Sequence, residues 1–164
     1  MYISIQHAVK KMLRMMAYKR YMVKIHNEIL NDIMRQMPII PPETGGIIGG
    51  KEGEVCLWKY DKGYFERPCS YSPNINYLNE VIAEWIDQDY DFMGIAHVHF
   101  GSSKGLSDSD KKYIEKIMKA MPDFVEKLYF PIVVQPEKQL VSYVAYQNSL
   151  GEIVIDEDVV EVFF

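Results

Sequence analysis

The chain has 164 residues, 48% of them apolar, which fits one domain with a sizeable core. Its 18 basic and 23 acidic side chains give a net charge of −5 at pH 7, which argues against the nucleic-acid backbone as main partner. Its apolar runs are only a few residues long, far short of the roughly 20 residues of a membrane-spanning helix, so we expect no transmembrane segment.

The first 25 residues carry six basic side chains and no acidic one. Apolar residues recur there at helical spacing: Ile5, Val9, Met12, Leu13 and Met16. This pattern predicts a basic amphipathic helix over residues 1–20, ahead of a domain over residues 21–164. Packing of this helix on its own domain is favoured, and binding to an anionic surface is the alternative.

The two cysteines, Cys56 and Cys69, share no close motif spacing, and we expect no secretory signal, because lysines interrupt the apolar residues near the start of the sequence. This usage predicts a reducing compartment and a cytoplasmic location. We expect both thiols to be small apolar side chains, buried or half-buried.

In chain order, the domain begins with an extended stretch over residues 22–25 and a helix from about Asn27 that prolines end. Short strands are expected over residues 44–48, 55–60 and 64–66, separated by turns with glycine. A second helix follows Pro73.

The second half of the chain begins with a strand over residues 92–99, predicted to be central and covered on both faces. A loop over 101–106 leads to a helix from Ser107, and the last strands are expected over 131–135, 140–146 and 153–155, extended by 159–163. This order predicts an α/β or α+β fold with a mixed central sheet flanked by helices.

His97 and His99 lie two residues apart on the central strand, so both imidazoles should project from the same face. Two imidazoles on one rigid strand suit a single metal ion such as Zn²⁺. A buried histidine bonded to a backbone carbonyl is the alternative for such a pair.

Asp110 lies in the first turn of the following helix, where its carboxylate could complete a three-ligand set. The run from Ser107 to Asp110 also matches an N-terminal capping box. We favour the ligand role because of the two histidines upstream. Two imidazoles and one carboxylate leave one position open for water, as in catalytic zinc sites.

Glu43 is the candidate base for such a site. It is followed by Gly45 and Gly46, which allow another backbone or an extended substrate to approach closely. Taken alone, a glutamate at a strand start is more often a solvated acid, so its role depends on the other motif residues.

The whole pattern resembles the JAMM (MPN-plus) zinc metallopeptidase family. Glu43 precedes a glycine pair, and about fifty residues later His97-Val-His99 is followed by seven residues, Ser107, two residues and Asp110. The family pattern is a glutamate ahead of a glycine pair, followed by H-x-H-x7-S-x2-D. The resemblance covers about residues 21–147.

The resemblance implies a cytidine-deaminase-like MPN fold in which His97, His99 and Asp110 hold Zn²⁺. It further implies that Glu43 takes a proton from a zinc-activated water and that Ser107 donates to the oxyanion. The implied reaction hydrolyses a peptide or isopeptide bond after the glycine-rich tail of a ubiquitin-like or sulfur-carrier protein. Short spacing between the motifs suggests a compact member of the prokaryotic type.

The sequence departs from the family at Phe100, where a proline usually follows the second histidine. The change leaves the proposed metal ligands in place. We expect it to alter the shape of the cleft beside them, and with it the choice of substrate. Two other functions stay open. A non-catalytic scaffold of the same fold is disfavoured because no ligand is lost, and an amidohydrolase would need a barrel of roughly 250 residues.

Overall fold

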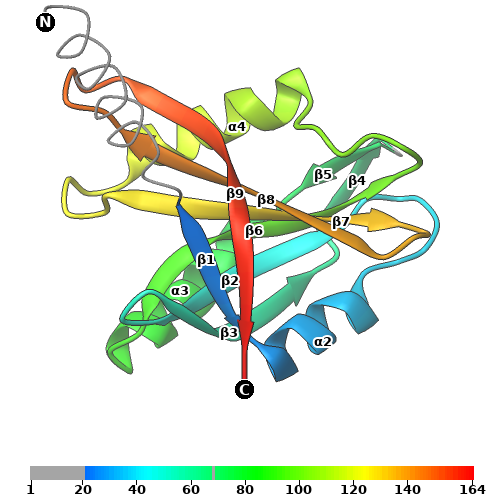
Figure 1. Ribbon diagram of the computed structural model, residues 1–164, viewed down its shortest axis with the longest axis horizontal. Coiled ribbons are helices and arrows are strands. Elements are labelled where there is room, and N and C mark those ends of the chain that lie inside the picture. The colour runs from blue at the N-terminus through cyan, green and yellow to red at the C-terminus, as the bar shows by residue number, and fades with distance from the viewer. Residues whose placement is uncertain (1–20, 68) are drawn as a thin grey trace, which may run out of the picture.

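Within residues 21–67 and 69–164, which the computed structural model describes, seven strands close into a barrel and three helices pack against it (Figure 1). The leader predicted to be helical over residues 1–20 lies outside the described residues. Around the barrel the strands follow the order β1 (Met22–His26), β3 (Glu54–Asp61), β2 (Gly45–Lys51), β6 (Asp91–Phe100), β7 (Lys127–Gln135), β8 (Gln139–Gln147) and β9 (Ile153–Phe163).

The mixed α/β architecture is confirmed, because the sheet contains both parallel and antiparallel pairs and carries helices on both sides. Closure of the sheet was not predicted. It arises because β1 pairs in parallel with both β3 and β9. A separate hairpin of β4 (Tyr64–Arg67) and β5 (Ser70–Ser72) lies between β3 and the next helix.

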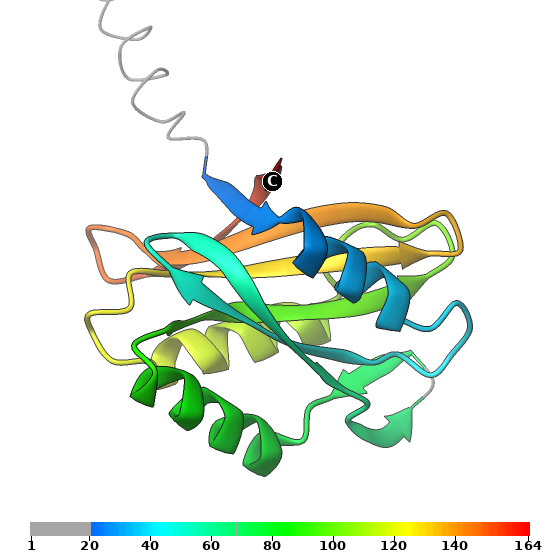
Figure 2. The same cartoon turned by 90° about the horizontal axis from the view of Figure 1, so that it is seen from below.

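The helices are α2 (Asn27–Gln36), α3 (Ile75–Asp87) and α4 (Asp108–Ala120), near the predicted positions. Helix α2 lies on one side of the sheet, and α3 and α4 lie on the other (Figure 2). Ile33 and Met37 join the interior cluster, the apolar core inside the barrel, whereas Leu78 and Ile114 join the outer cluster beneath α3 and α4. Each buried aliphatic side chain contributes roughly 1.5–3 kcal/mol, so these clusters fix the strands that carry the site.

Strand β6 includes the predicted central strand over residues 92–99, but its first residues face the opposite way. Phe92 packs in the outer cluster and Met93 in the interior cluster. Strict alternation back from His97 and His99 predicts Phe92 on the inner face of the strand and Met93 on the outer face. This prediction is wrong for both residues.

A β-bulge explains the exchange of faces. The register between β2 and β6 shifts between Ile48 and Gly49, and Gly94 has a φ of 146°. A Cβ at Gly94 would overlap the backbone carbonyl of Tyr129, so this close approach of β7 requires glycine. Beyond the bulge the alternation holds through His97 and His99.

Strand β7 begins at Lys127 rather than at the predicted Pro131. Its pairs with β6 skip from Tyr129 to Ile132, so the ladder is interrupted where proline has no N–H to donate. Proline therefore lies inside this strand instead of marking its start.

Strand β9 is continuous, and it includes both of the predicted segments. It pairs with β8 over residues 153–158 and with β1 over residues 159–163. This change of partner at Asp158 closes the barrel.

Neither cysteine is in a disulfide. Cys56 is half-buried, as expected, but Cys69 is exposed, so the prediction is wrong for Cys69. The reason is its position between β4 and β5, in a hairpin that the sequence pattern did not reveal. In the part of the chain that the structure describes, no helix is long and apolar enough to cross a membrane.

Candidate metal centre

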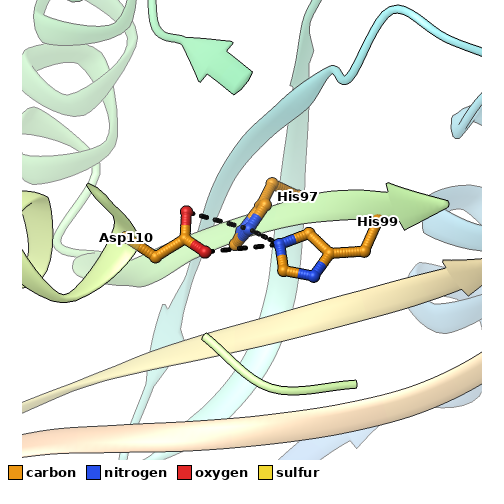
Figure 3. A group of neighbouring side chains, drawn as sticks. All are labelled: His97, His99 and Asp110. Carbon is orange, nitrogen blue, oxygen red and sulfur yellow. Dashed lines mark hydrogen bonds and ion pairs between the residues drawn. The ribbon is translucent and has the colours of Figure 1, made fainter. Parts of the chain in front are cut away.

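The predicted metal ligands come from two elements that meet beside the barrel (Figure 3). His97 and His99 lie on β6, and Asp110 lies in the first turn of α4. Alternate residues of a strand project from one face, and the two imidazoles therefore both point toward the start of α4.

The three side chains are in mutual contact. Nε2 of His97 lies 2.8 Å from Nε2 of His99 and 3.5 Å from Oδ1 of Asp110, and Nε2 of His99 lies 3.4 Å from Oδ2 of Asp110. Each histidine is 7% exposed. One ligand atom from each residue lies within 4.8 Å of the others, so the group could hold a metal ion.

The capping box and the ligand cluster are both present. Ser107 is the N-cap of α4, and its Oγ accepts from the N–H of Asp110 at 3.1 Å while its own N–H donates to Oδ2 of Asp110 at 2.7 Å. The same carboxylate faces both histidines. The two interpretations of this motif are therefore compatible, because the helix cap orients the ligand.

Glu43 lies beside this cluster. The N–H of Val98 donates to the carbonyl of Thr44 at 3.0 Å, so the antiparallel register places Glu43 next to His99. Its carboxyl group is half-buried, and it interacts electrostatically with His99, His97 and the acid of α4. The structure thus brings Glu43 close to the three predicted ligands.

Side chains of the protein itself pack closely against the glycine pair that follows Glu43. A Cβ at Gly45 would overlap the ring of Tyr71, and one at Gly46 would overlap the ring of Trp58. Of the two predicted uses of these glycines, close approach of the protein's own groups is the one observed.

Within the cluster, opposite charges and hydrogen bonds favour the ionised forms of Asp110 and His99, which burial disfavours. Burial opposes the ionised form of Asp110, but hydrogen bonds from His97 and His99 outweigh it and hold the pKa of Asp110 well below its usual range. Burial also opposes the imidazolium of His99, yet the hydrogen bond and charge of Asp110, with the charge of Glu43, raise its pKa. Burial raises the pKa of Glu43, although the two histidines counteract it.

The donor set fits a divalent cation. Two imidazole nitrogens that face each other at 2.8 Å cannot both be unprotonated acceptors without a cation or a proton between them. Tetrahedral zinc places such nitrogens about 3.3 Å apart, which small side-chain rotations would reach. The backbone of Ser103 also forms a hydrogen bond with His99, a contact typical of histidines that bind metals.

Two hollows lie beside the cluster, and both are lined by Tyr64 and Ser70 of the β4–β5 hairpin. The first has a volume of about 540 Å³ and includes His97 and Asp110 in its wall. The second has a volume of about 790 Å³ and includes Glu43. The hairpin therefore forms part of the wall of both hollows.

Sequence reasoning missed the two residues that connect this hairpin to the barrel. Asp61 is buried at the end of β3, and its carboxylate accepts from the hydroxyl of Tyr71 in β5 at 2.8 Å. Neither residue has a motif spacing. The available signal was weak: an aspartate at a strand end, followed by a glycine that suggests a turn.

Phe100, the departure from the family pattern, is half-buried and packs against the interior cluster. It pairs with Gln135 at the end of β7. Its side chain thus contributes to the core that supports the ligand strand.

Comparisons with known proteins support the fold. No protein-family model matches the chain, and no curated protein matches it either. Among solved structures, the chain is similar to protein DSY2949 from Desulfitobacterium hafniense, with a TM-score of 0.63, 14% identity, and coverage of 85% of this chain and 92% of the other. It also matches AF2198, a JAB1/MPN domain protein from Archaeoglobus fulgidus, with a TM-score of 0.47, 18% identity, and coverage of 84% and 99%. The first likeness shows a shared fold.

Proposed function

We propose that this chain is a zinc metallopeptidase of the JAMM (MPN-plus) type, with the cytidine-deaminase-like MPN fold over residues 21–164 and a basic extension over residues 1–20. The observation that carries the proposal is the convergence of His97, His99 and Asp110 on one point with Glu43 beside them. Three of these side chains lie close together in the sequence and Glu43 lies more than fifty residues away, and their proximity in space supports the proposal.

In this proposal His97, His99 and Asp110 hold Zn²⁺. The bound ion would supply a Lewis acid that polarises a carbonyl group and lowers the pKa of water. Glu43 accepts a proton from the attacking water and returns it to the departing amine, a role helped by the burial that raises its pKa.

Ser107 is the proposed donor to the carbonyl oxygen as that oxygen gains negative charge. Its oxygen already accepts from the N–H of Asp110, and a hydroxyl group can accept and donate at once. A well-placed donor of this kind contributes about 3 kcal/mol to stabilisation of the transition state.

The proposed substrate is a ubiquitin-like or sulfur-carrier protein, cleaved after its glycine-rich tail, in the cytoplasm. An extended tail binds well to an unpaired strand edge. Strand β5 pairs with β4 on one side, and its residues line the 540 Å³ hollow that reaches His97 and Asp110. We propose no nucleic-acid partner.

The test is cleavage of a panel of fusions in which ubiquitin-like and sulfur-carrier proteins precede a reporter. The zinc-loaded full chain should release the reporter from at least one fusion. Glu43→Gln should keep its zinc and lose activity by a factor of about 10² to 10⁴, the usual contribution of general acid–base catalysis.

The matched control is Glu84→Gln, which removes the same charge from the exposed side of α3 and should leave activity unchanged. Equal rates for Glu43→Gln and the parent would exclude Glu43 as the base. A parent that binds zinc and cleaves no fusion would favour the non-catalytic scaffold instead.

A further inference from the structure

Asp61 is a buried carboxylate for which the proposed reaction has no use. It is 5% exposed and accepts three hydrogen bonds. Its Oδ1 accepts from the N–H of Gly63 at 2.9 Å, and its Oδ2 accepts from the N–H of Asn74 and the hydroxyl of Tyr71, each at 2.8 Å. Hydrogen bonds to a charged acceptor are about twice as strong as neutral ones, so this group is a strong local anchor.

The three donors bracket the β4–β5 hairpin. Gly63 directly precedes β4, Asn74 follows β5 as the N-cap of α3, and Tyr71 is the middle residue of β5. The hydroxyl of Tyr64 in β4 also donates to Oδ1 of Asn74 at 3.0 Å. Asp61 therefore connects both ends of the hairpin and its second strand to the barrel.

The strand register places this anchor next to the metal centre. Gly45 pairs with Asp61 on one side and with His97 on the other, and the ring of Tyr71 lies over it, where a Cβ would come within 2.5 Å of ring carbon Cε1. The backbone of Tyr71 lies near the carboxyl group of Glu43, where it acts to lower the pKa of that group. One residue of the hairpin thus contacts both the anchor and the proposed base.

We propose that Asp61 is a positioning residue that, through the hydroxyl of Tyr71, holds the β4–β5 hairpin against the metal centre and keeps Glu43 in place. Its effect on catalysis rests on the proposed function, whereas the holding of the hairpin does not. Loss of the hydroxyl contact frees the hairpin while His97, His99 and the acid of α4 stay intact.

The experiment compares the zinc-loaded full chain with Tyr71→Phe and Asp61→Asn. Amide hydrogen exchange is measured on peptides that cover residues 64–72, zinc content by elemental analysis, and kcat on a fusion that the parent cleaves. The matched control is Tyr146→Phe, because the hydroxyl of Tyr146 donates to Oδ2 of Asp156, also at 2.8 Å, on strands β8 and β9.

We expect exchange over residues 64–72 to become about tenfold faster or more in Tyr71→Phe and Asp61→Asn, as the loss of one charge-assisted hydrogen bond predicts. Zinc content should not change. We expect kcat to fall by about tenfold in Tyr71→Phe and at least as far in Asp61→Asn, which also weakens the hydrogen bonds from Gly63 and Asn74. The double variant should fall no further than Asp61→Asn, because Asp61→Asn already weakens the contact that Tyr71→Phe removes. Tyr146→Phe should match the parent in all three measurements.

Unchanged exchange over residues 64–72 in Tyr71→Phe would overturn the proposal, and so would faster exchange spread over the whole chain with loss of zinc. Faster local exchange with unchanged kcat would overturn the positioning role. If the parent cleaves no fusion, the proposed function fails, and the exchange measurement alone still decides whether Asp61 holds the hairpin.

Discussion

Asp110 and Asp158 are two carboxylates at junctions of the fold, and their surroundings have opposite effects on them. Both oxygens of Asp110 face donors: the imidazoles of His97 and His99 and the N–H of Ser107. Asp158 lies where β9 changes partner, and its Oδ1 accepts from its neighbour's N–H at 2.7 Å. Its buried Oδ2 has no hydrogen-bond partner among the described residues.

The pKa of each group follows from these surroundings. Burial acts on both carboxyls, but the donors around Asp110 outweigh it and lower the pKa, whereas burial dominates at Asp158 and raises the pKa. A charged acid surrounded by converging donors suits a cation site. A buried carboxylate with one unpartnered oxygen reduces the stability of the folded state. Asp158 lies where β9 changes its pairing partner, away from the candidate metal centre.

The largest effect should follow removal of a ligand. We expect His97→Ala and Asp110→Asn each to lower bound zinc from about one ion per chain to almost none, because two remaining ligands bind the ion too weakly to survive dialysis. Elemental analysis after dialysis measures this. His26→Ala is the control, since His26 caps α2 outside the cluster and should keep full zinc. Full zinc in both ligand variants would show that the ion is held elsewhere.

The next largest effect should follow Ser107→Ala. This change removes both the N-cap and the proposed oxyanion donor, so we expect kcat to fall by a factor of about 10² to 10³ and the free energy of unfolding by about 1 kcal/mol. Zinc content should remain that of the parent. Steady-state kinetics and urea unfolding separate the two effects. An unchanged kcat would exclude Ser107 as the oxyanion donor and leave it only the role of N-cap of α4.

Asp158→Asn should have a smaller effect, a change in stability that distinguishes Asp158 from Asp110. Because burial raises the pKa of Asp158 on folding above its usual value of 3.8, the charged form destabilises the folded state above the raised pKa. Asp158→Asn should therefore be more stable than the parent at pH 7, by roughly 1 kcal/mol. The difference should shrink as the pH falls below the raised pKa, and it should be smallest below 3.8, where the acid is protonated in both states.

Thermal unfolding of the parent and Asp158→Asn between pH 4 and pH 7 gives this comparison. If the difference in stability between the two proteins stays constant over this range, the charge of Asp158 does not destabilise the folded state.

The smallest effect should follow removal of residues 1–20. The domain boundary proposed at residue 21 predicts unchanged zinc content and unchanged kcat, because the proposed ligands lie at or beyond residue 97 and Glu43 lies two residues ahead of β2. Elemental analysis of the shortened chain checks it. A metal-free product would place part of the folded domain within the removed segment.

Much of the site could be predicted from the sequence because its spacings are local. His97 and His99 are related by the period of a strand, and Asp110 by the first turn of a helix. Glu43 needed the family resemblance, since its position beside His99 depends on the pairing of β2 with β6.

The features that were missed depend on contacts between distant segments. The parallel pairing of β1 with β9 and the bulge at Gly94 follow from how neighbouring strands pack, which no periodicity records. Pro131 suggested a strand start, but tertiary packing accommodates it inside β7. Asp61 is one acid among many in the sequence, and only its three donors in space distinguish it.

The central claim is that His97, His99 and Asp110 bind one zinc ion together. Crystals of the full chain grown with one equivalent of zinc allow a direct test by anomalous scattering at the zinc absorption edge. The account predicts a single peak within about 2.3 Å of both Nε2 atoms and of one carboxylate oxygen of Asp110. No peak between these three side chains, or a stronger peak at another place on the chain, would contradict it.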